Sequence, residues 1–304
     1  MKKKNNLLQR KIEISSILEE IEINFERKEV IEKLDKFFNS PKAHVVGITG
    51  PPGVGKSSMI NKLLRILRNK NLSVGVLAVD PSSKESGGAL LGDRARFEIN
   101  PNDHNIFVRS LATKNFLGGI SEMTFPCMNV LRSFFDIIII ETVGVGQSEI
   151  SIQDIVDTVI FCVQPGSGDS LQFIKSGIIE IPDIICVTKS DLSKLANNTL
   201  SDIKSVKKFF TRTDQEISIL SVSSNDSVGF ENLYKSIDER WLYMKSKNKL
   251  YEQRRVQAEK WLKNTLINRF GLEGFKKISE IIEYGNNPFS SLRTISERIK
   301  IDLL

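Results

Sequence analysis

The sequence predicts an α/β fold in which a mostly parallel central sheet is flanked by helices, with further helices at both ends of the chain. Apolar runs short enough to be strands recur along the chain and alternate with segments of helical spacing. The run 136–140, DIIII, is so uniformly apolar that we expect a central parallel strand buried on both faces. A glycine-rich loop joins the first such run, 45–48, to a predicted amphipathic helix at 58–67.

The chain begins with a segment that we expect to be a helical extension, residues 1–41. Its apolar residues between about 6 and 39 recur at spacings that suit two amphipathic helices, and Pro41 with its polar neighbours marks the boundary. We assign this segment a packing role, and place the main domain at 42–245.

The glycine-rich loop is the strongest motif in the sequence. Gly50, Gly55, Lys56 and Ser57 satisfy the pattern GxxxxGK[ST] between a strand and a helix. Glycines let the backbone wrap phosphate oxygens, Lys56 supplies a positive charge, and the Ser57 hydroxyl suits Mg²⁺. The pattern predicts a P-loop NTPase whose nucleotide contacts are Gly50, Pro51, Pro52, Gly53, Val54, Gly55, Lys56, Ser57 and Ser58.

Two acidic residues follow the second predicted strand, 74–79. Asp80 ends that strand and precedes a loop rich in glycine and serine, so its carboxylate is placed to hold Mg²⁺ directly or through water. A turn or helix-capping role before Pro81 is the alternative. Asp93, in the same loop, carries the same two interpretations.

A short strand at 106–108, a polar loop at 109–119 and a helix at 120–134 lead to the strand 136–140. This strand delivers Glu141 and, three residues later, Gly144. In nucleotide hydrolases an acid here assists Mg²⁺, and the glycine amide contacts the terminal phosphate. Many small GTPases place a water-orienting glutamine directly after that glycine, whereas this chain has Val145. We therefore expect slow intrinsic hydrolysis and a partner that completes the site.

The strands predicted at 158–163 and 184–187 precede the sequence Thr188-Lys189-Ser190-Asp191. A carboxylate at Asp191 accepts two hydrogen bonds from the ring N–H and the exocyclic amine of guanine, and adenine offers no such pair. The sequence thus favours GTP over ATP. A further strand, 217–222, leads to the residues expected to close over the base, Ser223, Ser224 and Asn225, and a helix is expected at 229–245.

Residues 246–304 are charged and helical in pattern, with many apolar residues at helical intervals. Because the nucleotide domain looks complete by residue 245, we expect this segment to pack on a second copy, as the dimerisation arm of a homodimer.

Composition narrows the class of protein. The 304 residues carry 43 Lys and Arg against 37 acidic residues, a net charge of +6 spread along the chain rather than clustered. The three cysteines are widely separated, as in a reduced intracellular protein. No apolar stretch approaches the roughly 20 residues needed to span a bilayer. We expect a cytoplasmic protein that binds neither nucleic acid nor membranes.

Taken together, these motifs resemble those of the methylmalonyl-CoA mutase-associated GTPases, the MeaB/ArgK family. The resemblance rests on GITGPPGVGKSS, VDPSSKESGGALLGDRARF, LGGI, ETVGVGQSE, QPGSGDSLQFIK and TKSDL, and on the terminal helical segments. The chain departs from the family pattern at Phe97, Asn115 and Thr188.

The resemblance implies a dimerising GTPase that binds GTP or GDP with Mg²⁺ and protects, reactivates or gates adenosylcobalamin loading of an acyl-CoA mutase. It implies that Lys56 and Ser57 bind phosphate and Mg²⁺, and that Gly144 contacts the terminal phosphate. Asp80, Asp93 and Glu141 would surround the metal and the attacking water. The loops 80–97, 141–149 and 166–175 would be its three switches.

Two other functions share the loop architecture. A metallochaperone GTPase for a nickel enzyme should carry a cluster of histidines or cysteines, whereas His44 and His104 are the only histidines and no CxxC occurs. A nucleotide-dependent scaffold would bind its partner but hydrolyse no GTP.

Overall fold

The sheet has seven parallel strands in the order β3-β2-β4-β1-β5-β6-β7. The computed structural model describes residues 2–80, 97–100, 102–112, 122–142, 151–166, 182–206, 216–279, 285 and 287–302. Within these, the strands are β1 (His44–Thr49), β2 (Val74–Asp80), β3 (Ile106–Ala112), β4 (Ile137–Thr142), β5 (Thr158–Val163), β6 (Ile184–Val187) and β7 (Ser218–Ser221). Because every strand runs the same way, the sheet has one amino end and one carboxyl end.

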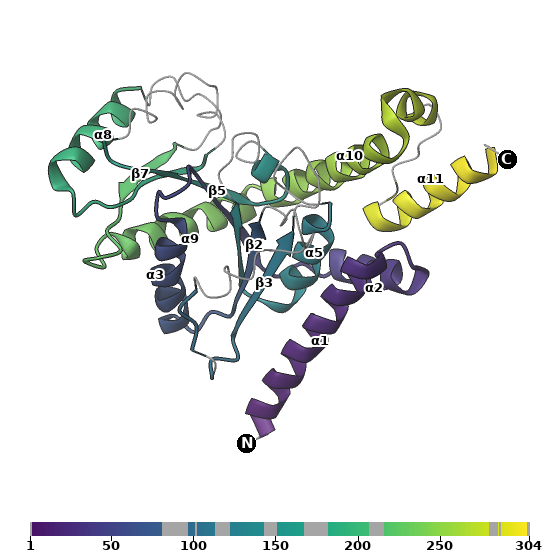
Figure 1. Ribbon diagram of the computed structural model, residues 1–304, viewed down its shortest axis with the longest axis horizontal. Coiled ribbons are helices and arrows are strands. Elements are labelled where there is room, and N and C mark those ends of the chain that lie inside the picture. Colours follow the sequence, from purple (N-terminus) through teal and green to yellow (C-terminus); the bar gives the residue numbers. More distant parts are fainter. Residues whose placement is uncertain are drawn as a thin grey trace, which may run out of the picture.

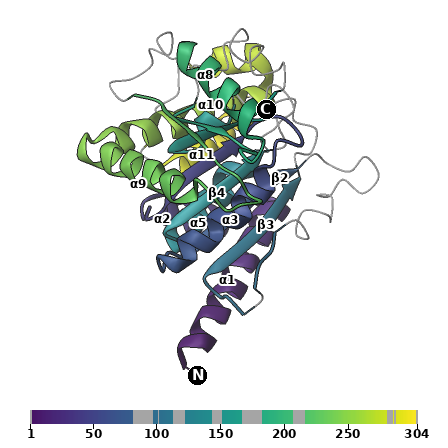
Figure 2. The same cartoon turned by 90° about the vertical axis from the view of Figure 1, so that its left-hand side faces the viewer.

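Helices cover both faces of the sheet (Figures 1 and 2). They are α1 (Lys2–Asn24), α2 (Lys28–Phe38), α3 (Lys56–Asn69), α5 (Thr124–Phe134), α8 (Ser193–Val206), α9 (Phe230–Ser246), α10 (Lys249–Ser279) and α11 (Pro288–Asp302), with a 3₁₀ turn, η1 (Ile152–Asp154). Alternate strand residues face opposite helices. Val46 and Ile48 of β1 pack with α3 and α9, whereas Val45 packs with α1, α2, α5 and α10.

The terminal helices share one core with the face of the sheet that they cover. Trp261 of α10 stacks on Phe125 of α5, with ring centroids 5.1 Å apart, and lies 5.0 Å from Phe289 of α11 and 6.3 Å from Phe25. Leu262 and Leu266 are buried in the same cluster. The expectation that the C-terminal apolar residues pack on a second copy is therefore wrong for these side chains, because the chain's own N-terminal helices and α5 bury them.

Most predicted elements are confirmed within a few residues. The strand predicted at 106–108 is longer, because β3 continues to Ala112 by pairing with β2 along its whole length. Residues 109–112 are thus strand rather than loop. The sequence analysis did not predict α8. Most of the three predicted switch loops, 80–97, 141–149 and 166–175, lies outside the described residues.

All three cysteines are free and buried, as expected from their apolar surroundings. The Sγ atoms of Cys162 and Cys186 lie 3.9 and 3.7 Å from Sδ of Met59, under the phosphate-loop helix. Burial raises the pKa of the Cys162 thiol to about 12, so it remains protonated. In the described part of the chain, no helix is both long and apolar enough to cross a membrane.

Candidate functional site: a nucleotide site at the carboxyl end of the sheet

The glycine-rich loop lies between β1 and α3, at the carboxyl end of the sheet. All three of its glycines, Gly50, Gly53 and Gly55, have φ angles in the region that favours glycine. Gly50 has φ 141°, and a Cβ there would lie 2.4 Å from the carbonyl oxygen of Cys162. Gly55 has φ 98° and is the residue that precedes the first turn of α3. The loop can therefore direct its amides and the positive amino end of α3 at one phosphate chain.

Lys56 is buried and folds back over this loop. Its ammonium group donates to the carbonyl oxygens of Gly50, at 2.7 Å, and Pro51, at 3.0 Å. A positive charge thus lies inside the curve of the loop, where phosphate oxygens would compete with these carbonyls for its protons. Phosphate binding by Lys56 stays a prediction, and this position of the ammonium group is suitable for it.

Ser57 and Glu141 meet across the strand ends. The Ser57 hydroxyl donates to a Glu141 carboxylate oxygen at 2.8 Å, and Glu141 is largely buried. They line a cavity of about 390 Å³ together with loop residues and the last residues of β2 and β4. Hydroxyl and carboxylate oxygens are the donors that Mg²⁺ prefers, so the residues present suit a magnesium ion.

A second part of the site lies after β6 and β7. The Asp191 carboxylate accepts hydrogen bonds from the Ser223 hydroxyl and the Asn225 side-chain amide, both at 3.0 Å. The bond from Ser223 is the main cause that lowers the pKa of Asp191, so this carboxylate is ionised at neutral pH. Ser224 lies in the turn between its two partners. An exposed carboxylate held by two neighbours is positioned to accept hydrogen bonds from a base.

Thr188 and Lys189 link the two parts of the site. The Thr188 hydroxyl donates to the Val54 carbonyl of the phosphate loop at 2.7 Å. The Lys189 ammonium donates to the Gly53 carbonyl and to the Gln164 side chain, each at 2.9 Å. The hydroxyl at position 188 thus holds the segment 188–191 against the phosphate loop.

For several other predicted site residues the structure describes only the backbone or nothing at all. Asp80 ends β2 beside Ala112 of β3, and only its backbone is described. Asp93 and Gly144 lie outside the described residues, as do Arg94, Arg96 and Val145. Arg109 of β3 pairs with Glu22 of α1 at 2.8 Å. Sequence reasoning did not identify Gln164 as a partner of Lys189, although Gln164 opens the segment QPGSGDSLQFIK that supports the family resemblance.

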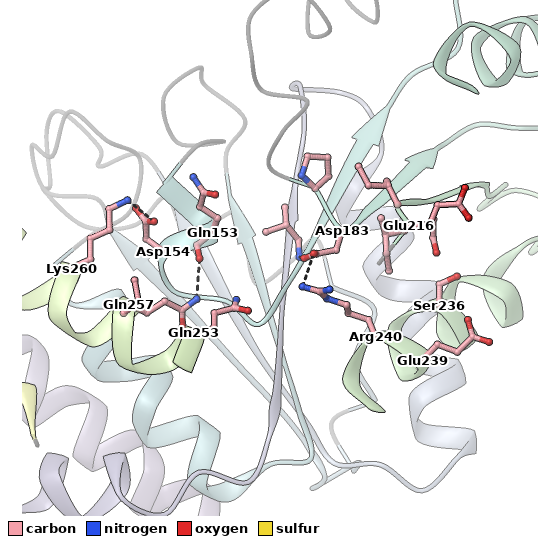
Figure 3. Close-up of a pocket in the computed structure, with 16 residues that line it drawn as sticks. Gln153, Asp154, Asp183, Glu216, Ser236, Glu239, Arg240, Gln253, Gln257 and Lys260 are labelled. Carbon is pink, nitrogen blue, oxygen red and sulfur yellow. Dashed lines mark hydrogen bonds and ion pairs between the residues drawn. The ribbon is translucent and has the colours of Figure 1, made fainter. Parts of the chain in front are cut away.

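A second cavity, of about 290 Å³, lies at the amino end of the sheet (Figure 3). Its polar side chains bind one another. Arg240 pairs with Asp183 at 2.8 Å, Lys260 with Asp154 at 2.7 Å, and Gln257 donates to the Gln153 carbonyl at 2.9 Å. The cavity shares no lining residue with the phosphate-loop cavity, and its bonds join α9 and α10 to the sheet.

The fold and the carboxyl-end site define a P-loop GTPase. More particularly, the chain belongs to the family described as methylmalonyl Co-A mutase-associated GTPase MeaB, whose model matches residues 18–275.

Named relatives agree with this assignment. A putative GTPase of Pyrococcus horikoshii is 36% identical over 270 residues, 84% of each chain. A mouse protein named methylmalonic aciduria type A homolog, mitochondrial, is 34% identical over 279 residues, 90% of this chain and 66% of the relative. A solved structure titled LAO/AO transport system kinase has a TM-score of 0.68 at 23% identity, covering 98% of this chain and 97% of that one. At that identity the likeness shows the fold alone.

Proposed function

We propose that this GTPase is a chaperone for an adenosylcobalamin-dependent acyl-CoA mutase of the methylmalonyl-CoA type, which it protects, reactivates or loads with its cofactor. The observation that carries the GTPase part is the meeting of Lys56, Ser57 and Glu141 beside Asp191 at one end of the sheet. Support for the mutase part comes from the family description and from the name of the mouse relative.

Each residue of the carboxyl-end site would have a separate role in binding or hydrolysing GTP. Lys56 would exchange its two loop carbonyls for phosphate oxygens, and Asp191 would accept hydrogen bonds from guanine. Ser57, Asp80, Asp93 and Glu141 would hold Mg²⁺, which neutralises charge on the phosphates when bound. The amide of Gly144 would contact the terminal phosphate. The Ser57–Glu141 hydrogen bond holds two of these four side chains together.

The proposal also includes stimulation of turnover by the mutase and the formation of a homodimer. Val145 leaves no water-orienting glutamine next to Gly144, so turnover would be slow until the mutase binds. The homodimer would use the outer surface of the C-terminal segment, where Tyr251, Val256 and Leu272 are exposed. Light scattering of the purified chain tests the dimer directly, because a monomeric mass at all concentrations would exclude it.

GTP turnover measured with and without a methylmalonyl-CoA mutase tests the main proposal. We expect slow turnover of the chain alone, several-fold stimulation by the mutase, and co-elution of the two proteins. Lys56→Ala is the control that should abolish both basal and stimulated turnover. A mutase that neither binds nor changes the rate would refute the chaperone role while leaving the GTPase assignment intact. Binding without any turnover would instead favour a nucleotide-dependent scaffold.

A further inference from the structure

A cavity of about 820 Å³ lies where the two terminal extensions meet the nucleotide domain. Its walls come from the ends of α2, α5 and α9, from the first half of α10 and from the start of α11. These helices pack on one another, α2 against α5 and α11, and α11 against α10 (Figure 1). The volume falls within the range of small-molecule sites, and no lining residue is shared with the phosphate-loop cavity.

Positive charge dominates the lining of this extension cavity. Arg132, Lys245, Arg254 and Arg255 line it, and Glu259 is the acidic residue among the lining residues. Glu259 pairs with Arg255 at 2.6 Å. Arg254 makes two hydrogen bonds to Asp157, which lies behind the wall.

Arg132 is the exceptional member of this set. It is only 2% exposed, its Nη2 donates to the Asn129 side chain, and its guanidinium lies 5.7 Å from the ring of Phe38. Its Nε has no hydrogen-bond acceptor, and no carboxylate pairs with it among the described residues. Burial and the nearby charge of Arg254 lower its pKa to about 9, although the charge of Asp157 acts in the opposite direction. The carboxylate that attracts it, Asp157, is already bonded to Arg254. A buried cation whose neighbouring carboxylate is bonded to another cation is costly, so an anion from outside would be bound strongly at this position.

The remaining walls suit an apolar or aromatic body rather than a bare inorganic ion. Phe38 and Pro41 line one side, and Leu250, Tyr251 and Leu262 of α10 another. Leu250 and Tyr251 belong to the first turn of α10, whose positive amino end adds to the preference for an anion.

We propose that the extension cavity is a binding site for a small organic anion, a carboxylate or phosphate monoester with an apolar or aromatic body, whose charged group contacts Arg132. Such a ligand would bridge the N-terminal extension, α5 and the C-terminal helices. It would therefore stabilise the arrangement of the extensions around the nucleotide domain.

The test uses the full chain saturated with GDP and Mg²⁺, so that the nucleotide site is filled. Anilinonaphthalene sulfonate is titrated by fluorescence and calorimetry, beside N-phenyl-naphthylamine, which has the same rings without the sulfonate. We expect one saturable sulfonate site per chain and at least tenfold weaker binding of the neutral probe. Phenyl phosphate or benzoate should displace the sulfonate, and the more effective of the two identifies the preferred anionic group.

Two variants locate the site. Arg132→Gln should weaken sulfonate binding about tenfold, the effect of losing one charged hydrogen bond, and leave the neutral probe and GTP turnover unchanged. The Arg255 side chain is 57% exposed, so its replacement should not disturb folding. Arg255→Glu should weaken sulfonate binding several-fold. Arg293→Gln, on α11 but outside the cavity, is the matched control. Equal sulfonate binding by all variants, equal affinity for both probes, or displacement by neither anion would overturn the proposal.

Discussion

The two ends of the sheet use acidic residues in opposite ways. At the amino end, Asp136, Asp157 and Asp183 each precede a strand and accept a hydrogen bond from the backbone N–H of Ser73, Val45 or Val159 respectively, at 2.8 to 2.9 Å. Each also pairs with a cation: Lys42 at 2.7 Å, Arg254 at 2.6 Å and Arg240 at 2.8 Å.

The acidic residues of the carboxyl end follow their strands or lie in their last residues. Glu141 accepts from the Ser57 hydroxyl, and Asp191 from Ser223 and Asn225. The amino-end aspartates thus have backbone amides and side-chain cations as partners. The hydroxyl and amide groups that donate to Glu141 and Asp191 are neutral donors of the kind that a nucleotide or a metal can replace. Position before or after a strand therefore separates acids that hold the sheet together from acids available for chemistry.

The largest expected effect is at the amino end. Asp157 is 1% exposed; burial alone would raise its pKa, and Arg254 lowers it below the usual value. Asp157→Asn would leave the guanidinium of Arg254 without its counter-ion, and should lower the free energy of unfolding by about 3–5 kcal/mol in urea titrations. Asp136→Asn is the control, since Lys42 is 57% exposed and a loss of about 1 kcal/mol or less is expected. If both variants lost the same free energy of unfolding, burial of the ion pair would not explain its contribution to stability.

At the carboxyl end, Lys56→Ala should affect function rather than stability. Removing one positioned charge from a phosphate site typically lowers turnover by about 100- to 1,000-fold, measured here as phosphate release from GTP. The free energy of unfolding should change by about 1 kcal/mol, the value of its loop hydrogen bonds. Lys62→Ala, on the same helix but bonded to Ser227, should change neither. A large loss of stability in Lys56→Ala would contradict the inference that charged residues at the carboxyl end serve function and those at the amino end serve stability.

The pH dependence of stability should also have a source at the amino end. His44 is buried, stacked on Trp241 and bonded to Thr158, and burial lowers its pKa to about 4. From pH 6.5 to pH 4 the unfolded chain binds a proton that the folded chain does not, so stability falls as the pH falls. Between pH 6.5 and pH 4 the free energy of unfolding falls by about 3 kcal/mol for this reason.

Comparing wild type with His44→Gln by urea titration at pH 7, 5.5 and 4 isolates this contribution from that of the carboxylates. The variant should lose about 3 kcal/mol less between pH 7 and 4, whereas His104→Gln should behave like wild type. Identical pH profiles for all three proteins would show that His44 binds protons equally in both states.

The smallest effect is on base recognition. Asp191→Asn should weaken GDP binding by roughly tenfold, because a charged acceptor is lost, and leave stability unchanged. Its amide gains a donor, so binding of the xanthine nucleotide should improve relative to GDP. Isothermal titration with both nucleotides measures the ratio. An unaltered preference for guanine would remove Asp191 from the base site.

The carboxyl-end site could be predicted in detail because its signals are local. The loop from Gly50 to Ser57 contains both the backbone that needs glycine and the lysine that it binds. Short apolar runs located the strand ends, and parallel strands place Glu141 and Asp191 at one end of the sheet. The extent of β3 was missed because Arg109 and Ser110 are polar, and pairing with β2 overrides their composition. The polar pattern of α8 gave no comparable signal.

The sequence by itself determined the fold class and the phosphate loop, and it predicts the acid that binds the base, because each depends on residues within one loop or one strand end. Tertiary structure alone decided where the terminal helices pack and which charges lie beside them. Trp261 reaches Phe25 and Phe125, and Arg254 reaches Asp157, across long stretches of chain that no periodicity connects. Such contacts form only when apolar faces from distant segments are buried together. Charged groups buried with those faces are costly unless they pair with one another, so the packing decides which of them become partners.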